Sequence, residues 1–264
     1  MIDIELHEKL RAKYNPEGSD LRRQQLRMLE ILLHIDKICK EHNIKYWLSS
    51  GTMLGAVRHG GFIPWDDDLD IEMMREDYLK FEKVFKETDD YILQTHKNDF
   101  CYMMPYAKVR DKHTILEERF GGNVYKYQGC FVDIFPMEYT HKSMNFLTYG
   151  LVWALRKYIV PRYKSQSRNL LLKFVKKCSF GMMSIVRVVD KLIPGKKLRY
   201  TYGTWCYREK RDDKDIFPLS TIQFEGYEFP APFNADGYLS KLYGSYMAIP
   251  KVKDPHSSKV EFLK

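Results

Sequence analysis

One short acidic segment constrains the fold of this chain more than any other part of its sequence. Residues 64–71 read PWDDDLDI, so four aspartates fall within five positions and apolar residues alternate with the last of them. Successive side chains of a β-strand point to opposite faces, so the pattern predicts a strand over about 67–73. Its acidic face holds Asp66, Asp68 and Asp70. Its apolar face, which we expect in a core, holds Leu69, Ile71 and Met73.

The close spacing of these aspartates predicts a metal site. Asp68 and Asp70 start roughly 6–7 Å apart along the backbone, so their carboxylates can converge on one hard cation. Packing carboxylates together costs free energy through mutual repulsion, which a divalent metal relieves. The alternative is a solvated acidic turn, but an exposed turn needs no apolar residue at every second place. We therefore expect Mg²⁺ or Mn²⁺, which prefer oxygen ligands.

Two further segments complete the predicted site. Residues 49–52 read SSGT and form a small-residue turn between a strand and a helix, where Gly51 lets the backbone approach a ligand. We expect this turn to bind phosphate through Ser50, Gly51 and Thr52. Asp133 is the one acid in the apolar stretch 129–136, and burying it is costly unless it has a partner. Its alternative role is structural, with backbone amides as partners.

Periodicity and turn signals predict the elements around the site. Apolar positions recur at helical spacing between Ser19-Asp20 and Glu41, which predicts an amphipathic helix capped at its start. The same reasoning gives two more helices, over 52–58 and 75–87. The remaining candidates are strands over 44–48, 91–95, 104–110 and 130–135.

The residues of the predicted site carry a resemblance to a known family. A Gly-Thr turn, an acidic pair on the next strand and a third acid on a later strand are similar to the nucleotidyltransferase fold. More specifically, residues 51–71, GTMLGAVRHGGFIPWDDDLDI, closely resemble the signature of the LicD family. The resemblance continues at 108–114, 131–136 and 238–250, and covers about 20–140 and 220–255. The chain departs from the family in having Ser245 where an acid is usual.

The resemblance implies both a fold and an activity. LicD proteins transfer phosphocholine or related phospho-alcohols onto bacterial surface glycans, and the fukutin-related ribitol-phosphate transferases are distant relatives. The implied fold is α/β (α+β), a nucleotidyltransferase-like mixed sheet flanked by helices. The implied donor is CDP-choline or a similar CDP-alcohol. The implied acceptor is a glycan of lipopolysaccharide, teichoic acid or capsule, lipid-linked acceptors included.

The acidic residues take roles in such a transfer, which needs a metal to neutralise the diphosphate and a base for the acceptor hydroxyl. Asp68 and Asp70 are expected to be metal ligands. Asp133 is expected to be a third ligand, the general base, or both. Asp66 shares their face and is expected to support the metal site.

Basic and aromatic residues are the remaining candidates. Arg58 is a candidate phosphate ligand, with a surface arginine at a helix end as the alternative. Lys108 and Arg110 alternate onto one face of a strand and are candidates to hold phosphate oxygens, with a solvated strand edge as the alternative. A choline ammonium favours an aromatic cage, although each candidate can equally be a core residue. The cage candidates are Trp65, Tyr102 and Tyr106.

A basic block interrupts the resemblance. Residues 141–200 contain 14 Lys and Arg but one acid, Asp190, in a chain whose net charge is +8. The block looks helical, and it has two interpretations: an interfacial element that binds an anionic membrane surface, or a helical cap with solvated lysines. We therefore expect a catalytic core over 1–140, a basic helical elaboration over 141–205 and a C-terminal segment, 206–264, that completes the core.

Composition limits the location of the protein. The five cysteines are widely spaced and lack a C-x-x-C pair, which speaks against a disulfide framework or a zinc knuckle and suits a reducing cytoplasm. The first residues lack the apolar segment of a secretory signal. The longest apolar stretch, 144–155, is much shorter than the about 20 residues of a membrane span. We expect a cytoplasmic protein, attached to the inner face of the membrane under the first interpretation of the block.

Two other functions stay open at this point. A nucleotidyltransferase would move the nucleotide itself onto a small hydroxylated acceptor and release pyrophosphate, whereas phospho-alcohol transfer from a CDP donor releases CMP. A non-catalytic binder of RNA or another anionic polymer would carry basic residues around the acidic strand. The positive charge is instead confined to 141–200, so we expect no nucleic-acid partner.

Overall fold

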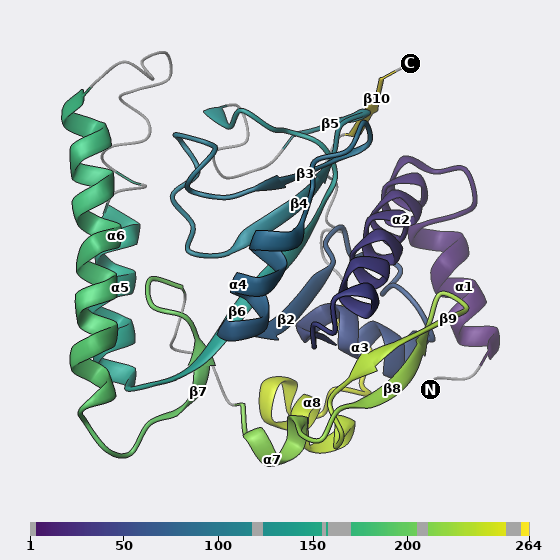
Figure 1. Ribbon diagram of the computed structural model, residues 1–264. Helices are drawn as coiled ribbons and strands as arrows, with labels where there is room; N and C mark the ends of the chain where they lie inside the picture. Colours follow the sequence, from purple (N-terminus) through teal and green to yellow (C-terminus); the bar gives the residue numbers. More distant parts are fainter. Residues whose placement is uncertain are drawn as a thin grey trace.

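A six-stranded mixed sheet organises the computed structural model, which describes residues 4–117, 124–154, 157, 170–204, 211–251 and 260–263. The strand order is β1 (Trp47–Leu48), β2 (Asp70–Met74), β6 (Phe131–Thr140), β4 (Ala107–Asp111) and β3 (Tyr91–Gln94). A sixth strand, β7 (Lys197–Tyr200), pairs with the second half of β6. β2 and β6 are parallel, and all other neighbours in this sheet are antiparallel. The predicted α/β class with a mixed sheet and flanking helices is confirmed (Figure 1).

Apolar side chains on one face of the sheet form the core. Leu69, Ile71 and Met73 are fully buried, as the alternation predicted. α2 (Asp20–Glu41) and α4 (Arg75–Val84) pack against β6 on this side and bury their own apolar stripes. The start of α2 is fixed by Ser19, whose hydroxyl accepts a hydrogen bond from the Arg22 amide at 3.2 Å.

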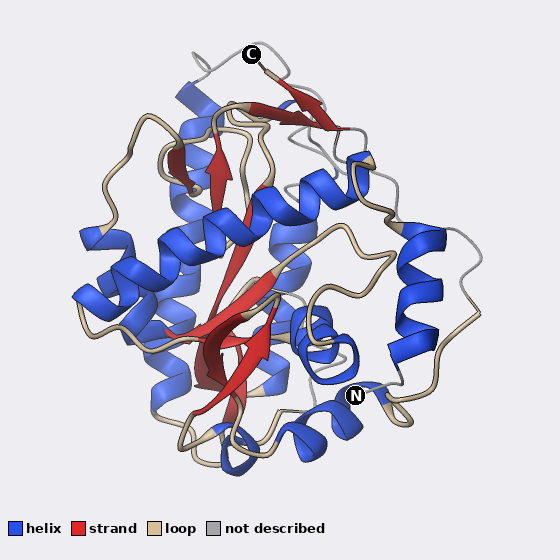
Figure 2. Ribbon diagram, turned by 90° about the vertical axis from the view of Figure 1, so that its right-hand side faces the viewer, coloured by secondary structure: helices blue, strands red, loops and turns tan. Residues whose placement is uncertain are grey.

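The C-terminal part of the chain packs onto the same core. It comprises α7 (Asp213–Ile216), the hairpin of β8 (Ser220–Phe224) and β9 (Tyr227–Ala231), and α8 (Ala235–Tyr243). β8 and α8 contact α3 (Ser50–His59), and β9 contacts β1. Figure 2 shows helices on both sides of the sheet. The core residues that this part contributes are Ile216, Phe224, Phe229, Ala231, Tyr238 and Leu239.

Two peripheral pieces were not expected from the sequence. α1 (Ile4–Tyr14) has no buried residue and lies against the rest through Tyr14, whose ring is 5.3 Å from that of Trp65. β5 (Thr114–Leu116) pairs with β10 (Val260–Phe262) in a separate two-stranded sheet.

The basic block forms two helices, α5 (Lys142–Ala154) and α6 (Leu170–Lys191), which pack against each other at the end of the molecule far from α1 and α2 (Figure 1). The expectation that 141–200 is helical throughout is wrong at its end, because 197–200 is strand β7 and continues the sheet. Residues 155–156 and 158–169 of the block lie outside the described residues. Within the described part of the chain, every helix is too short or too polar to cross a membrane.

The predicted strand boundaries also need correction. The acidic strand begins at Asp70 rather than near residue 67, and residues 66–69 approach it without strand pairing. The strand predicted over 44–48 is reduced to Trp47–Leu48. Both shifts leave Leu69 in the core, so the alternation of faces survives although the ladder is shorter.

Candidate active site

The parallel pairing of β2 with β6 brings the predicted acidic segments together. Asp70 and Asp133 are register partners, and the Asp133 amide donates to the Leu69 carbonyl at 2.9 Å. On the other side of β6, Lys108 of β4 is the register partner of Asp133. Since alternate residues share a face, these three side chains lie on the face opposite the apolar core.

Burial and mutual repulsion dominate the electrostatics of the aspartates. The pKa of Asp70 is raised well above its usual value, first by burial and then by the carboxylates of Asp68, Asp133 and Asp66. The pKa of Asp66 is raised in the same way, by burial and then by Asp68 and Asp67. Residues 66–70 thus bring several carboxylates together at the start of β2.

Lys108 places a positive charge in this cluster. Its ammonium lies 2.9 Å from Asp133 Oδ1 and 3.1 Å from Oδ2, and both side chains are nearly buried. Lys108 also acts to lower the pKa of Asp70. The expectation of a solvated strand edge does not describe Lys108, which is 5% exposed.

The turn at the start of α3 is tied to the acidic segment. Thr52 Oγ1 accepts a hydrogen bond from the Asp70 amide at 2.8 Å. A Cβ on Gly51 would lie 2.9 Å from Asp66 Oδ2, so a larger residue there displaces this carboxylate. Ser50 has a left-handed φ of 48°, and its amide donates to the Tyr238 hydroxyl at 3.2 Å. The turn therefore lies against the acidic cluster, as the sequence predicted for a single site.

A further acid on the same face, Glu72, was not identified from the sequence. Glu72 is fully buried and accepts hydrogen bonds from Trp47 Nε1 at 2.8 Å and Ser49 Oγ at 2.7 Å. It also forms an ion pair with the buried Arg211. The signal available was its position two residues after Asp70, where the alternation places another acid on the site face.

Arg211 is a further residue that sequence reasoning missed. Its Nη2 lies 3.3 Å from Ser50 Oγ, and its guanidinium carbon lies 4.4 Å from the centre of the Tyr200 ring. The Nε of Arg211 is buried and has no hydrogen-bond partner among the described residues. Arg211 thus brings a cation from the C-terminal part of the chain to the start of α3.

The predicted basic residues divide between the site and the scaffold. Arg58 is 3% exposed and donates from Nη1 to the carbonyls of Tyr246 at 2.9 Å and Ala248 at 3.2 Å. Burial lowers its pKa, and Asp66 acts in the opposite direction, which places Arg58 beside the cluster rather than on the surface. Arg110 is fully buried and donates to Gln94 and to the Gly129 carbonyl, so it braces neighbouring strands of the sheet.

Of the three predicted cage residues, Tyr106 lies in a half-buried aromatic row. Its ring centre is 4.5 Å from Phe135, which is 5.0 Å from Tyr200. Phe135 follows Asp133 by two residues and shares its face, and Asp70 contributes to the raised pKa of Tyr200, which burial dominates. All three side chains are half-buried, so the row borders the acidic cluster with partly open rings.

The other two cage candidates are core residues. Trp65 packs between Tyr14 and His59, with ring centres at 5.3 and 6.0 Å. Tyr102 is fully buried 5.5 Å from Tyr125. The sequence could not separate these cases, because an aromatic residue near a motif can face either side of the backbone.

The chemistry of the acidic cluster fits a hard divalent cation. Asp66, Asp68 and Asp70 offer oxygen donors, and the pKa values of Asp66 and Asp70 are raised partly by neighbouring carboxylates, a repulsion that a cation removes. Among the described residues, however, no three Asp, Glu, His or Cys side chains already stand as a metal-ligating group. Asp133 is paired with Lys108 instead.

Comparison with known proteins gives independent evidence on the family of this chain. Residues 43–170 match the family model described as LicD/FKTN/FKRP, nucleotidyltransferase domain, an interval that contains every aspartate of the site. The lipopolysaccharide cholinephosphotransferase LicD of Haemophilus influenzae is 28% identical over 257 residues, which cover 89% of this chain and 95% of that protein.

Two further relatives match shorter parts of the chain. An uncharacterised protein of Rickettsia prowazekii is 37% identical over 131 residues, covering 42% of this chain and 47% of that protein. The human ribitol 5-phosphate transferase FKRP is 40% identical over 55 residues, which are 21% of this chain and 11% of that protein.

Proposed function

Since residues 43–170 of this chain are a domain of the LicD family, we propose that the protein transfers phosphocholine from CDP-choline to a hydroxyl of a cell-surface glycan. The observation that carries the proposal is the acidic cluster on one face of the sheet, with Asp70 and Asp133 in register and Lys108 beside them. The similarity to a cholinephosphotransferase over most of both chains supports the choice of reaction.

Asp68 and Asp70, supported by Asp66, are the residues that would hold Mg²⁺ or Mn²⁺. A bound metal would neutralise charge on the donor diphosphate as the bond to CMP breaks. These three carboxylates suit the role, because the pKa values of Asp66 and Asp70 are raised partly by neighbouring carboxylates, a repulsion that a cation would relieve.

Asp133 is proposed as the general base. Its carboxylate would accept the proton of the acceptor hydroxyl as the oxygen attacks phosphorus. Lys108, 2.9 Å from Asp133 Oδ1, fixes the position of this carboxylate and brings positive charge toward the transferred phosphate.

The donor phosphates are proposed to lie at the start of α3. Two groups that are far apart in the sequence meet there: the backbone amides of the turn 50–52 and the guanidinium of Arg211. Arg211 is suited to an anion because its charge is already oriented by Glu72 and by the ring of Tyr200.

The aromatic row is proposed as the binding surface for the choline ammonium. The partly open rings of Tyr106, Phe135 and Tyr200 stand next to the acidic cluster, where the alcohol of the donor has to lie. Cation–π contacts contribute about 0.5–2 kcal/mol each depending on burial, and ribitol or glycerol would gain none of this. The row therefore favours choline over an uncharged alcohol.

The test is CMP release from CDP-choline by the full chain with Mg²⁺ or Mn²⁺ and glycan from the host. We expect metal-dependent CMP release that is lost in Asp68→Asn, Asp70→Asn and Asp133→Asn, with Asp67→Asn as the matched control that stays active. Full activity in the Asp68 and Asp70 variants would contradict the mechanism. Activity with CDP-ribitol or CDP-glycerol alone would contradict the choice of choline.

A second candidate reaction is transfer of the nucleotide itself. The family model carries the name of a nucleotidyltransferase domain, and the same acidic cluster serves either reaction. The product separates them, because nucleotide transfer releases pyrophosphate and leaves the nucleotide on the acceptor.

A further inference from the structure

An ordinary surface helix buries its apolar stripe, but α6 buries polar side chains and leaves many apolar ones exposed. Among the residues that α6 buries are Lys176, Ser179 and Asp190, all polar. Their partners are polar too: Lys176 Nζ donates to the carbonyls of Asp99 at 2.9 Å and Phe100 at 3.0 Å. The inner side of α6 is thus held by these polar contacts together with Met183, which packs in a small apolar cluster with Val152 and Tyr202.

The outward side of α6 is apolar. Phe174 is 64% exposed, Ile185 is 65% exposed and Leu192, directly after the helix, is 83% exposed. Helical spacing joins these residues into one stripe about five turns long. We call this stripe the α6 outer face; its members are Phe174, Met182, Ile185, Val188, Val189 and Leu192.

The neighbouring helix α5 adds to the exposed apolar surface. Phe146, Leu147 and Trp153 are each more than two-fifths exposed, although α5 buries Asn145 and Thr148. Exposed apolar patches of this extent are unusual on a monomer and indicate a surface that something else covers. Among the described residues, no other element covers the α6 outer face.

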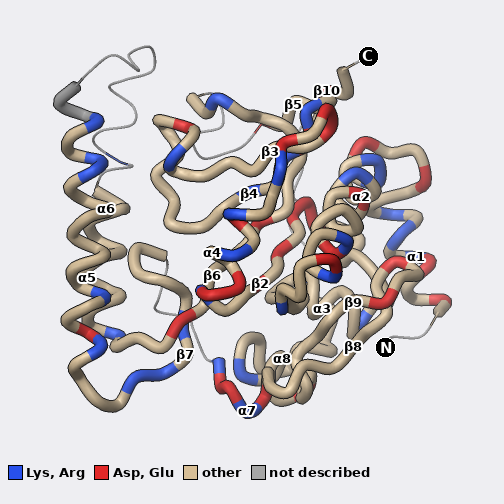
Figure 3. The backbone as a smooth tube through the Cα atoms, viewed as in Figure 1, with Lys and Arg blue, Asp and Glu red and all other residues tan. Residues whose placement is uncertain are grey.

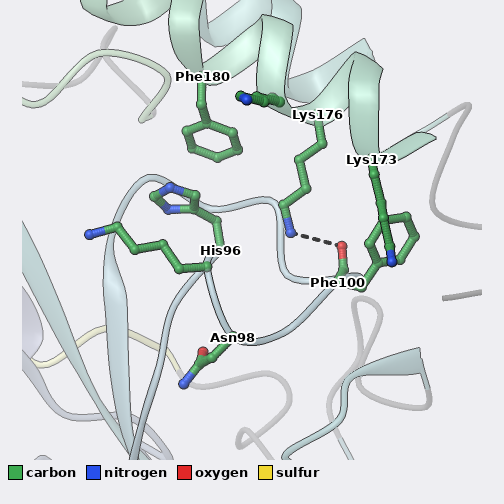
Figure 4. Close-up of a pocket in the computed structure, with 8 residues that line it drawn as sticks. His96, Asn98, Phe100, Lys173, Lys176 and Phe180 are labelled. Carbon is green, nitrogen blue, oxygen red and sulfur yellow. Dashed lines mark hydrogen bonds between the residues drawn. The ribbon is translucent and has the colours of Figure 1, made fainter. Parts of the chain in front are cut away.

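Basic residues also lie along α6 (Figure 3). Lys173 and Lys177 lie along one flank of α6, and no acidic side chain among the described residues forms an ion pair with either. They line a cavity of about 450 Å³ between α6 and residues 96–100. Figure 4 shows Lys173 and Lys176 of α6 together with Asn98 and Phe100, and His96 stacked on Phe180 at 3.8 Å. The cavity has four lysines and no acid in its lining; Lys97 pairs with Glu82 and Lys176 with the two carbonyls, and the other two suit a phosphate group.

This charge pattern distinguishes between possible occupants of the surface. The sole acid of α6, Asp190, is fully buried against His141 and Tyr202. A second copy of the chain would therefore bring like charges together at the flanks. An anionic bilayer would instead accept the apolar stripe among its acyl chains and pair its phosphates with the lysines.

We propose that the α6 outer face docks the protein on an anionic lipid bilayer, with α6 in the plane of the interface and a lipid phosphate in the cavity lined by Lys173 and Lys177. Trp153 of α5 enters the same interface. This inference does not depend on the transferase reaction, since it concerns a surface made of other residues.

The experiment is co-sedimentation of the full chain with vesicles of phosphatidylcholine alone or of equimolar phosphatidylcholine and phosphatidylglycerol. We expect binding to the mixed vesicles at low salt, with at least about tenfold weaker binding to the neutral ones and at high salt. Ile185→Glu and the pair Lys173→Gln/Lys177→Gln should each weaken binding about tenfold or more. The matched controls, Phe233→Glu and Lys80→Gln/Lys83→Gln, should bind as the parent chain does.

Fluorescence supplies a readout without a disruptive variant. Brominated lipids quench indoles that enter the bilayer, and Trp47 and Trp65 are buried in the core. We expect quenching in the parent chain that is reduced in Trp153→Phe. Undiminished binding by Ile185→Glu, or binding that salt does not weaken, would overturn the proposal. A dimer that Ile185→Glu dissociates, without vesicle binding, would also overturn it and assign the face to a second copy.

Discussion

Asp70 is placed where function and stability oppose each other. Its carboxylate is buried among those of Asp68, Asp133 and Asp66, and its pKa is raised as a result. We predict that Asp70→Asn lowers the rate of CMP release by roughly 100-fold or more, because the proposed mechanism assigns this carboxylate to the metal. The same change removes like-charge repulsion, so its melting temperature should not fall. Paired activity and thermal unfolding measurements check this, and a strongly destabilised variant would contradict the electrostatic argument.

The Glu72–Arg211 pair joins opposite charges, whereas Asp70 lies among like charges. Both groups are buried, so each single substitution leaves an uncompensated charge inside the protein. We predict that Glu72→Gln and Arg211→Met each lower the free energy of unfolding by about 3–5 kcal/mol. The double variant should lose clearly less than the sum of the two. Denaturant titration of the four proteins measures the coupling, and additive losses would show that the pair does not act as a unit.

At the scale of residues, the alternation of side chains along a strand determined which site residues could be predicted from the sequence. Asp68, Asp70 and Asp133 stand out because acids in apolar surroundings need a partner. Glu72 follows the same rule, yet its role depends on Arg211, which lies 139 positions further on. No sequence pattern around Arg211 predicts that its side chain lies at the site. The aromatic row has the same origin, since Tyr106, Phe135 and Tyr200 meet only through strand pairing.

At the scale of elements, α6 is fastened to the sheet domain by a titratable contact. His96 stacks on Phe180, and burial followed by the charges of Lys176 and Lys97 lowers the pKa of His96 to about 4. Between its ordinary value near 6.5 and 4, the unfolded chain binds a proton that the folded chain does not. The free energy of unfolding that depends on neutral His96 is therefore fully present above about pH 6.5, and it is lost as the pH falls toward 4.

This sign gives a measurable prediction for His96→Phe, which keeps the ring stack but cannot titrate. From neutral pH to about pH 4, its free energy of unfolding should fall less than that of the parent chain, by on the order of 2 kcal/mol. Urea titrations at several pH values measure the difference. His113→Phe is the matched control, because His113 is exposed and lies beside Asp90. Identical pH profiles for the parent chain and His96→Phe would contradict the argument.

Elements with strong periodicity could be predicted, and those that depend on distant partners could not. The apolar spacing of α2 and its cap at Ser19 define that helix locally. β7 was hidden in a basic block that looks helical, because its strand character comes from pairing with Tyr139 and its neighbours on β6. β2 starts three residues later than its sequence pattern suggests, since the ladder begins only where Asp133 is available as a partner.

At the scale of the whole molecule, Glu225 joins the two ends of the chain. Its amide donates to the Gly60 carbonyl at 2.9 Å, and its carboxylate accepts from the Phe62 amide at 3.0 Å and Arg22 at 2.8 Å. We predict that Glu225→Ala lowers the free energy of unfolding by about 2–4 kcal/mol, because a nearly buried arginine and an amide lose their acceptor. Glu228→Ala, on the exposed side of the hairpin, is the control and should change it by less than about 0.5 kcal/mol.

The same contacts predict cooperative unfolding of the described core. β8, β9 and α8 share one apolar cluster with α2 and the sheet, so tryptophan fluorescence and far-ultraviolet circular dichroism should report a single transition. Two transitions would show that the C-terminal part unfolds separately.

The long central strand β6 sets the distance between Asp133 and helix α5. β6 carries Asp133 near its start and ends at Thr140, and α5 begins two residues later, so at most about 23 Å of rigid strand separates the carboxylate proposed as the base from the helices proposed to dock. A protein held on a bilayer by α6 would carry its catalytic groups at a set height above the lipid headgroups. Acceptors would then be sorted by length, because a glycan hydroxyl close to its lipid anchor could not rise to the site and one far along the chain would overshoot it.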